Sequence, residues 1–239
     1  PNTQELSGDK RIFNNFLTNS NFYDSIYRKK EFYEKKLDSV ENFPEKPGDL
    51  MKHQEIIARF LSTHTLYNKL LLVHEMGTGK TCAAVAAMEQ LKRENNGIRG
   101  ALYIAKGQTL VNNFVNELVY KCTDGRYIHE ADEDEDDIYV EDELSNINPK
   151  KLIKQFYRTN TFEMFAKEIK NSSDSTLRKK YNNLVIVIDE VHNLRYHKTK
   201  EKGLNIYNQF YRFLHIVENC KILLMSGTPM KDGVEEIAS

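Results

Sequence analysis

The sequence predicts an α/β domain with a mostly parallel sheet flanked by helices, and three observations support this prediction. An apolar run from Leu70 to Val73 leads into a glycine-rich turn and then into residues of helical composition. A second apolar run, Leu184 to Ile188, is continuous and rich in β-branched residues, as in a strand buried on both faces of a parallel sheet. Further strands are expected at Gly100 to Ala105 and at Lys221 to Met225, with helical segments between the strands.

The glycine-rich turn after the first strand is typical of a phosphate-binding loop. Backbone N–H groups that converge at a helix N-terminus suit a triphosphate, and glycines let the backbone approach it closely. Lys80 would reach the β and γ phosphates, and the Thr81 hydroxyl would hold Mg2+. His74 replaces the first glycine of the strict pattern, so an ordinary turn with a surface lysine is the alternative. The predicted nucleotide contacts in this turn are Met76, Gly77, Thr78, Gly79, Lys80 and Thr81.

Two acids, Asp189 and Glu190, directly follow the second apolar run. They would lie at the carboxyl end of a buried strand, where open α/β sheets bind their ligands. Asp189 can complete the Mg2+ shell through water, and Glu190 can polarise the attacking water. The predicted catalytic residues are Lys80, Asp189 and Glu190, and the predicted metal ligands are Thr81 and Asp189.

The chain before the loop contains two segments. Residues 1–48 form an expected N-terminal helical extension rich in aromatic residues, which either dock on the main domain or bind a partner. Residues 49–61 carry apolar positions at helical spacing, with Asp49 as the expected N-cap. Within that helix, the Gln54 amide can donate to and accept from an adenine edge, or it is simply a surface residue.

Candidate nucleic-acid contacts lie after the second expected strand along the chain and at the start of a later expected helix. Lys106 and Gly107 come directly after Gly100 to Ala105, before a helix expected from Thr109 to about Lys121. A loop in this place can hold a phosphate of a nucleotide or of a nucleic-acid backbone, although Lys106 can also be merely solvated. The candidate contacts are Lys106, Gly107 and Thr161, and Thr161 is also the expected cap of a helix at 161–169.

The strongly acidic run at 130–143 lacks core-forming residues and predicts a flexible insertion at about 129–146. Mimicry of nucleic acid, or contact with a basic partner, is the alternative for this run. The other expected segments are a short helix or edge strand at 152–159, a polar connection at 172–180, a basic loop at 195–203 and an aromatic-rich helix at 204–218.

Composition bounds these predictions. The 239 residues are 40% hydrophobic and 29% charged, as in ordinary soluble globular proteins, and the formal net charge of -1 does not by itself indicate a nucleic-acid binder. No apolar run approaches the roughly 20 residues needed to cross a bilayer. Cys82, Cys122 and Cys220 lie far apart without a CxxC spacing, so we expect reduced thiols and no structural zinc. The ends of the chain suggest a fragment of a longer protein.

Taken in order, the motifs resemble the first RecA-like half of superfamily 2 helicases. They are HQ at 53–54, EMGTGKT at 75–81, DEVH at 189–192 and SGTPM at 226–230. EMGTGKT and SGTPM are more similar to Snf2-type translocases than to DEAD-box helicases. Together with ALYIAKGQTLVNNF and IDEVHNLR, they resemble the nucleoside triphosphatases of large cytoplasmic DNA viruses, of the poxvirus early transcription factor and nucleoside triphosphatase I types. The resemblance covers roughly residues 50–230.

This resemblance implies roles for particular residues. Lys80 and Thr81 would contact phosphate and Mg2+, Asp189 would contact Mg2+, and Glu190 would activate water. Gln54 would contact adenine. His192, Ser226 and Thr228 would couple the nucleotide state to the grip on nucleic acid. A second RecA-like domain, which carries an arginine finger, is absent from this fragment, so weak ATP hydrolysis is expected because such an arginine contributes about 10^3-fold or more.

The implied function is the ATP-binding motor domain of a nucleic-acid-dependent translocase, acting on double-stranded DNA in viral early transcription. Implied partners are duplex DNA, the second RecA-like domain of the parent chain, and a viral RNA polymerase or transcription factor subunit, with no membrane. Implied locations are the virion and host cytoplasm, or otherwise a soluble intracellular compartment. Alternatives are a transcription-termination ATPase of the same family, a nucleotide-dependent switch and a non-catalytic scaffold.

Overall fold

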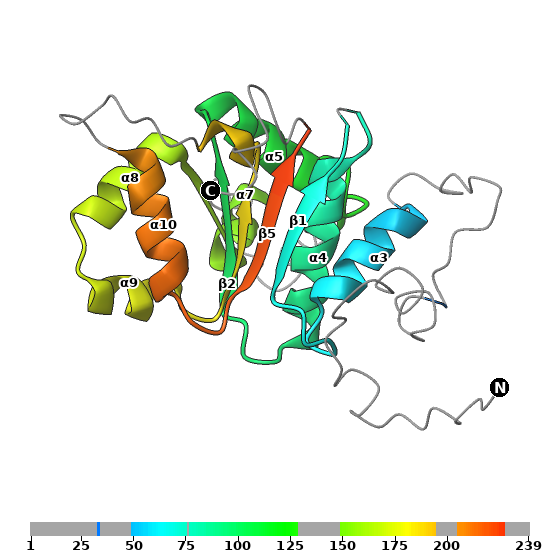
Figure 1. The fold of residues 1–239 in the computed structure, drawn as a ribbon. Helices are drawn as coiled ribbons and strands as arrows, with labels where there is room; N and C mark the ends of the chain where they lie inside the picture. The colour runs from blue at the N-terminus through cyan, green and yellow to red at the C-terminus, as the bar shows by residue number, and fades with distance from the viewer. Residues whose placement is uncertain (1–32, 34–48, 76, 129–148, 195–204, 228–239) are drawn as a thin grey trace, which may run out of the picture.

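The computed structural model describes residues 33, 49–75, 77–128, 149–194 and 205–227. These residues contain a five-stranded parallel sheet with the strand order β1-β5-β4-β2-β3 (Figure 1). The predicted parallel sheet is thereby confirmed. The strands are β1 (Lys69–Val73), β2 (Gly100–Ala105), β3 (Tyr157–Thr161), β4 (Leu184–Ile188) and β5 (Lys221–Ser226).

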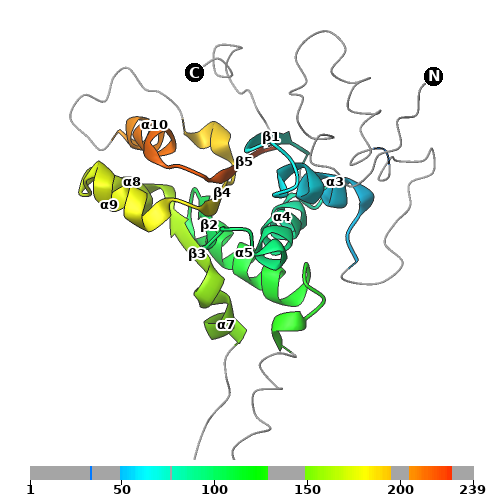
Figure 2. The ribbon, with the colours of Figure 1, turned by 90° about the horizontal axis from the view of Figure 1, so that it is seen from below.

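Helices cover both faces of this sheet, as the view in Figure 2 shows. The helices on one face are α3 (Lys52–Leu61), α4 (Lys80–Glu94) and α5 (Gln108–Tyr120), with α7 (Pro149–Phe156) at the side next to β3. The helices on the other face are α8 (Phe162–Lys170), α9 (Asp174–Tyr181) and α10 (Ile206–Ile216). A short 3-10 helix, η2 (Val191–Asn193), follows β4.

The central strand β4 is buried on both faces, as its continuous apolar run predicted. Val185 and Val187 pack in the cluster formed with α3, α4 and α5, whereas Ile186 and Ile188 pack in the cluster formed with α8, α9 and α10. Alternate side chains of a strand point to opposite faces, so a strand between two helical layers needs apolar residues at every position.

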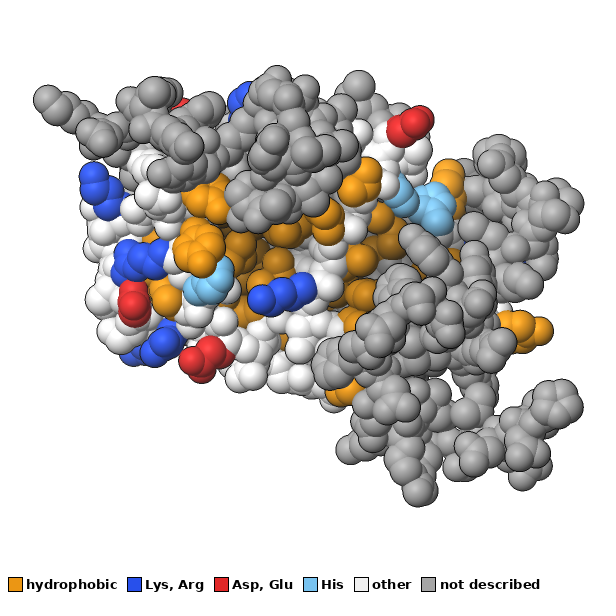
Figure 3. Space-filling model, in the orientation of Figure 1, with side chains coloured by type: hydrophobic (Ala, Val, Ile, Leu, Met, Phe, Trp, Pro, Cys, Tyr) orange, Lys and Arg blue, Asp and Glu red, His pale blue; other side chains and the backbone are white. Residues whose placement is uncertain are grey.

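The strand that leads into the glycine-rich loop is less buried. β1 lies at the edge of the described sheet, where Leu71 is 49% exposed and Val73 is 47% exposed. Apolar side chains gather over the β5 and β1 region in Figure 3. The apolar composition of β1 therefore predicted a strand correctly, although it does not lie in the middle of the described sheet as β4 does.

Two of the expected local features were wrong. Met51, not Asp49, is the N-cap of α3, and the Gln54 side chain accepts a hydrogen bond from the Met51 backbone N–H at 2.9 Å. The polar connection expected at 172–180 is instead the helix α9, which Ser173 caps by accepting from Thr176 N–H. That helix buries Leu177 and Tyr181, whose spacing of four residues places them on one face.

The segment expected at 152–159 as a short helix or an edge strand contains both, because α7 ends at Phe156 and the edge strand β3 begins at Tyr157. Thr161 caps α8 as predicted, by accepting a hydrogen bond from Met164 N–H. The predicted helices after β2 and before β5 correspond to α5 and α10.

The expectation of reduced thiols was wrong for two of the three cysteines. A disulfide joins Cys82 in the first turn of α4 to Cys122 beyond α5, across a sequence separation of 40 residues and a Cα–Cα distance of 5.1 Å. These cysteines meet because α4 and α5 cover the same face of the sheet, a relation that spacing along the chain does not reveal. Cys220 is free and buried.

A buried carboxylate anchors the side of α4 that faces α5. Glu89 is 5% exposed, and its Oε1 accepts hydrogen bonds from the hydroxyls of Tyr127, at 2.5 Å, and Tyr157. Its Oε2 accepts from Arg126 at 2.9 Å. Every acceptor oxygen of this carboxylate is thus engaged, as a buried charge requires.

A buried cation lies at the start of β5. Lys221 Nζ donates to the carbonyl oxygens of Ser62 at 3.0 Å and Tyr67 at 2.8 Å, both in the connection from α3 to β1. Burial lowers the pKa of Lys221 to about 8. The lysine thereby joins β5 to the segment that precedes its partner strand.

Several predicted features lie outside the described residues. They are the N-terminal extension apart from the exposed helical residue Tyr33, Met76, the acidic run, the basic loop at 195–203, and Thr228. In the part of the chain that is described, no helix combines the length and the apolar character needed to cross a membrane.

Candidate functional site

The glycine-rich loop and the acid pair meet at one edge of the sheet. β1, β4 and β5 are neighbours, with Val73 opposite Ser226 and Ile188 opposite Leu224. The backbone N–H of His74 continues this pairing by donating to the Ser226 carbonyl at 3.1 Å. Segments that are more than 100 residues apart in the chain therefore converge at the carboxyl ends of three adjacent strands, as expected for parallel sheets.

Two glycines give the loop its shape. Gly77 and Gly79 have φ angles of +85° and +79°, in the left-handed region that favours glycine. At Gly79, which caps α4, a Cβ would also lie 2.7 Å from Gln54 Nε2. The conformation therefore favours glycine at position 79, and a Cβ there would displace the Gln54 amide from its contact with the loop. His74 has no positive φ, so the first position of the motif does not need a glycine here.

The helix α3 holds the loop from one side. Gln54 is 4% exposed, its Oε1 accepts from Met51 N–H, and its Nε2 donates to the Gly79 carbonyl at 3.2 Å. The Gln54 amide, predicted as an adenine contact, thus already connects α3 to the loop. Its side chain retains one further N–H and further lone pairs for a ligand.

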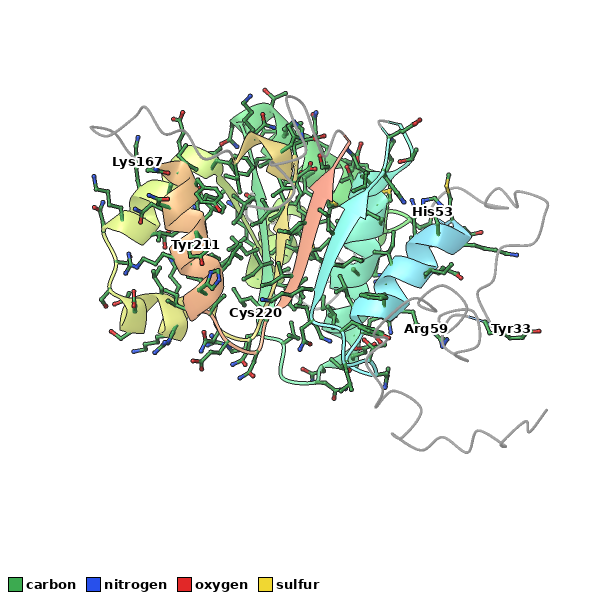
Figure 4. All side chains as sticks on the ribbon, viewed as in Figure 1. Tyr33, His53, Arg59, Lys167, Tyr211 and Cys220 are labelled. Carbon is green, nitrogen blue, oxygen red and sulfur yellow. A yellow bond between two sulfur atoms is a disulfide. The ribbon has the colours of Figure 1, made fainter. Side chains whose placement is uncertain are left out.

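Two histidines line the same side of the loop. His53 Nε2 lies 3.2 Å from the Thr78 carbonyl oxygen, and the ring centroids of His53 and His74 are 5.4 Å apart. Figure 4 shows His53 toward the carboxyl end of β1 and Cys220 at the opposite end of the sheet. Burial, followed by the charges of His53 and Lys80, lowers the pKa of His74. A neutral His74 therefore adds no positive charge to that of Lys80 beside the loop.

Lys80 and Glu190 form an ion pair across the loop. Lys80 Nζ lies 3.0 Å from Glu190 Oε1, and Glu190 has a φ of +51°, which is rare for a residue with a side chain. Burial raises the pKa of Glu190, but the hydrogen bond and charge of Lys80 outweigh burial and hold it below its usual range. The structure therefore brings together two of the three predicted catalytic residues and keeps Glu190 ionised.

Asp189, the third predicted catalytic residue, is less exposed to solvent than Glu190. It is 8% exposed, and its Oδ2 accepts from the Tyr103 hydroxyl at 2.6 Å while its Oδ1 accepts from Glu190 N–H at 2.9 Å. Burial raises the pKa of Asp189, and the charge of Glu190 adds to this, although Tyr103 and Lys80 oppose it. A buried carboxylate with so little positive charge nearby is suited to a cation such as Mg2+.

Two of the three predicted coupling residues, His192 and Ser226, are in contact, and Thr228 lies outside the described residues. His192 Nδ1 lies 2.9 Å from Ser226 Oγ and 3.2 Å from Glu190 Oε2. The backbone N–H of Gly227 donates to the same Glu190 oxygen at 3.4 Å. The turn after β5 is thus connected to the carboxylate after β4, and Ser226 itself is fully buried.

The three candidate nucleic-acid residues lie at the ends of β2 and β3, which pair at Ala105 and Thr161. The Thr161 hydroxyl is engaged in capping α8. Gly107 is the N-cap of α5, and a Cβ added to it would meet nothing within 4 Å. Lys106 is exposed, and its Nζ lies 3.0 Å from Asn193 Oδ1.

Comparison with known proteins places this arrangement in a family. The family model described as type III restriction enzyme, res subunit (ResIII), matches residues 48–231. The chain belongs to the ResIII family. The predicted resemblance to the RecA-like domain of superfamily 2 helicases is confirmed, and this ResIII domain is helicase-like.

Individual relatives agree with the family. The ResIII domain is 43% identical over 216 residues to a protein of Invertebrate iridescent virus 3 that is named as a helicase, 087L, covering 87% of this chain and 21% of that protein. It is 40% identical over 187 residues to one of Frog virus 3, 009L, covering 78% of this chain and 19% of that protein. Nucleoside triphosphatase I of Choristoneura fumiferana entomopoxvirus is 28% identical over 216 residues, covering 84% of this chain and 29% of that protein. The chain thus spans about a fifth of the two helicases.

Sequence reasoning missed two polar residues of the ResIII domain's site. Tyr103 stands inside an otherwise apolar buried strand and stacks on Phe114 with ring centroids 3.9 Å apart. A lone hydroxyl in such a strand was a signal that it needs a buried partner. Asn193 follows DEVH and bonds to Lys106, His192 and Glu190. The sequence carried no signal for these contacts.

Proposed function

We propose that this chain is the first motor domain of a nucleic-acid-dependent ATPase that translocates on double-stranded DNA in viral early transcription. The observation that carries the proposal is the convergence of Lys80, Asp189 and Glu190 at the carboxyl edge of the sheet, with Lys80 and Glu190 3.0 Å apart. Two relatives of Acanthamoeba polyphaga mimivirus that are named as ATP-dependent RNA helicases, R563 and L377, support ATP as the nucleotide. The activity is proposed for the intact protein; the chain alone is expected to hydrolyse ATP weakly.

The residues fit Mg-ATP in the following way. The N-terminus of α4 has no acidic residue in its first turn, and its backbone N–H groups and Lys80 would hold the phosphates. Thr81 and, through water, Asp189 would hold Mg2+, which would neutralise charge between the β and γ phosphates. The nucleotide contacts proposed earlier in the loop, Met76 to Gly79, and Gln54 complete this set.

The Lys80–Glu190 pair has a consequence for catalysis. A γ phosphate would take Lys80 as its partner, and this exchange would release Glu190 Oε1. The freed carboxylate is ionised and lies beside His192 and Gly227, which would keep it oriented while it accepts a proton from the attacking water. Through the contact between His192 and Ser226, the turn after β5 would follow the state of the nucleotide.

The test is the ATP hydrolysis rate of the intact protein, alone and with duplex DNA, single-stranded DNA or RNA. Glu190→Gln is the inactive reference, and Glu163→Gln, on an exposed position of α8, is the matched control. We expect stimulation by duplex DNA that is lost in Glu190→Gln and kept in Glu163→Gln. Stimulation by RNA alone would contradict the choice of DNA. A rate that is indifferent to all three would contradict the motor and favour a nucleotide-dependent switch, whereas no hydrolysis at all would favour a scaffold.

A further inference from the structure

Asn193 occupies a junction between the loop after β2 and the catalytic glutamate. Its Oδ1 lies 3.0 Å from Lys106 Nζ, its Nδ2 lies 3.0 Å from the Glu190 carbonyl oxygen, and the same Nδ2 lies 3.0 Å from His192 Nε2. One side chain thus contacts a candidate nucleic-acid residue, a catalytic residue and a coupling residue.

The orientation of the Asn193 amide is determined from both of its ends. A lysine ammonium can only donate hydrogen bonds, so the group that faces Lys106 must be the amide oxygen. A backbone carbonyl can only accept, so the group that faces the Glu190 carbonyl must be the amide NH2. The two requirements agree.

This orientation determines which nitrogen of His192 carries the proton. Asn193 Nδ2 donates toward His192 Nε2, so a neutral His192 must have a lone pair on Nε2 and its proton on Nδ1. His192 Nδ1 faces Glu190 Oε2 at 3.2 Å and Ser226 Oγ at 2.9 Å. In the other tautomer, a lone pair on Nδ1 would face the carboxylate and repel it.

Asn193 also supports the backbone of Glu190. The Glu190 carbonyl accepts from both the side chain and the backbone N–H of Asn193, the latter at 2.9 Å. These bonds hold a residue whose φ of +51° is unfavourable for a side chain with a Cβ. Asn193 therefore acts on the catalytic glutamate through both its main chain and its carboxylate.

We propose that Asn193 is the positioning residue that orients Glu190, by fixing the Nδ1–H tautomer of His192 and by holding the Glu190 carbonyl, and that it connects this glutamate to Lys106. The second part rests on the proposed nucleic-acid-dependent function. A backbone phosphate that draws Lys106 away from Asn193 would remove the constraint on the amide oxygen. The binding of nucleic acid would in this way change the orientation of Glu190 through the side chains of Lys106 and Asn193.

The first test reads the tautomer directly. Long-range proton–nitrogen NMR spectra of the full chain with 15N-labelled histidine distinguish the two tautomers, with His192 assigned by the loss of its signals in His192→Gln. The same spectra distinguish a doubly protonated ring from either neutral tautomer, so they are recorded at increasing pH until the His192 ring is neutral. We expect Nδ1–H in the wild type and a proton on Nε2 in Asn193→Asp, whose carboxylate would accept it. In Asn193→Leu only Glu190 and Ser226 still face the ring, through Nδ1, so we expect Nδ1–H to be kept.

The two variants separate positioning from folding. Asn193→Asp keeps an acceptor for Lys106 and nearly the same size but cannot donate to His192, whereas Asn193→Leu removes both functions. Asn112→Leu, at an exposed position on α5, is the control and should leave His192 unchanged. An Nε2–H tautomer in the wild type would overturn the proposal. So would the absence of a proton from Nε2 in the folded Asn193→Asp variant.

The second test concerns the connection to Lys106 and uses the intact protein. The measured quantity is the ratio of the ATP hydrolysis rates with and without nucleic acid. We expect this ratio to fall at least about 5-fold in Asn193→Leu, which removes the acceptor for Lys106, because couplings between two sites are typically 5-fold to 150-fold. Asn193→Asp, which keeps that acceptor, should retain most of the stimulation. An unchanged ratio would overturn the connection. If the wild type itself is not stimulated, the proposed function fails, while the tautomer result still decides the role of Asn193 toward Glu190.

Discussion

Two glutamates of this domain meet a cation at almost the same distance, in very different surroundings. Glu190 Oε1 lies 3.0 Å from Lys80, and Glu89 Oε2 lies 2.9 Å from Arg126. Both pairs involve α4, because Lys80 is its first residue and Glu89 is its tenth. The ion pair alone therefore does not distinguish Glu190, the proposed catalytic glutamate, from Glu89.

The difference lies in the other hydrogen bonds of each carboxylate. The Glu89 side chain is 6% exposed and accepts two tyrosine hydroxyls in addition to its arginine. The Glu190 side chain is 22% exposed, and its second oxygen is approached at 3.2 and 3.4 Å by His192 and Gly227. Short internal bonds make Glu89 part of the core, whereas longer bonds to residues at strand ends leave Glu190 able to change partners.

The largest expected effect comes from removing the charge of Glu190. Glu190→Gln should lower the ATP hydrolysis rate of the intact protein about 10^3-fold, because a general base contributes roughly 10^2-fold to 10^4-fold. The partly exposed carboxylate contributes little to stability, so the free energy of unfolding should change by less than about 0.5 kcal/mol. Equal rates for Glu190→Gln and folded Glu89→Gln would remove the distinction between the two glutamates.

The disulfide joins Cys82, close to Lys80 in the sequence, to Cys122, close to Arg126 in the sequence. Its reduction should have the next largest effect, on stability. Reduction of Cys82–Cys122 should lower the free energy of unfolding by about 4 kcal/mol, since the closed loop of 40 residues restricts the unfolded chain. Urea unfolding with and without dithiothreitol measures this loss. Cys220→Ser should still respond to the reductant, whereas Cys122→Ser should not. A response that persists in Cys122→Ser would contradict the pairing.

Glu89→Gln should destabilise the domain by about 2 kcal/mol, because hydrogen bonds to a charged group contribute roughly 1.5–3 kcal/mol and the Arg126 side chain is 44% exposed. Urea unfolding is again the measurement. Binding of a fluorescent ATP analogue by the folded variant should match the wild type. A loss of binding with unchanged stability would assign Glu89 to the site instead.

The smallest expected effect concerns the adjacent acids Asp189 and Glu190. Removing their charges should change the free energy of unfolding in opposite directions. The pKa of Asp189 is raised by burial, so its charge destabilises the ligand-free fold, and Asp189→Asn should add about 1 kcal/mol of stability near neutral pH. That gain should shrink as the pH falls through the folded pKa, where Asp189 becomes neutral. The pKa of Glu190 is lowered, so its contribution is present above its unfolded pKa and is lost as the pH falls through the lowered one.

Unfolding of both variants across the acidic range checks this prediction. Glu190→Gln should be slightly less stable than the wild type near neutral pH, and the difference should vanish at low pH. If Asp189→Asn and Glu190→Gln changed the free energy of unfolding near neutral pH in the same direction, the opposite pKa shifts of the two carboxylates would be contradicted.

Much of the fold could be predicted because its strands carry local signals. β2, β4 and β5 each contain a continuous apolar run, and α4 follows a glycine-rich turn. The polar helix α9 was missed because only Leu177 and Tyr181 are buried in it, too few to give a helical period in the sequence. Its Ser173 cap was the available signal.

The candidate site was predicted where residue type and strand end coincide, as for Lys80, Asp189 and Glu190. What could not be predicted are contacts between segments distant in sequence. Tyr103 and Asp189 are 86 positions apart, and Lys106 and Asn193 are 87 positions apart. Glu89 in a helix likewise looks like an ordinary surface residue until Tyr127 and Tyr157 are brought against it.

The position of β1 in the sheet has a consequence for biosynthesis. β1 pairs with β5, where Lys69 lies opposite Ile222, so the strand before the phosphate loop waits for a partner that the ribosome makes about 150 residues later. At roughly 5–20 residues per second, this delay is about 8–30 s. The hydrogen bond from His74 N–H to the Ser226 carbonyl likewise forms only after Ser226 has been synthesised. We therefore expect a growing chain to acquire nucleotide binding only after β5 has emerged.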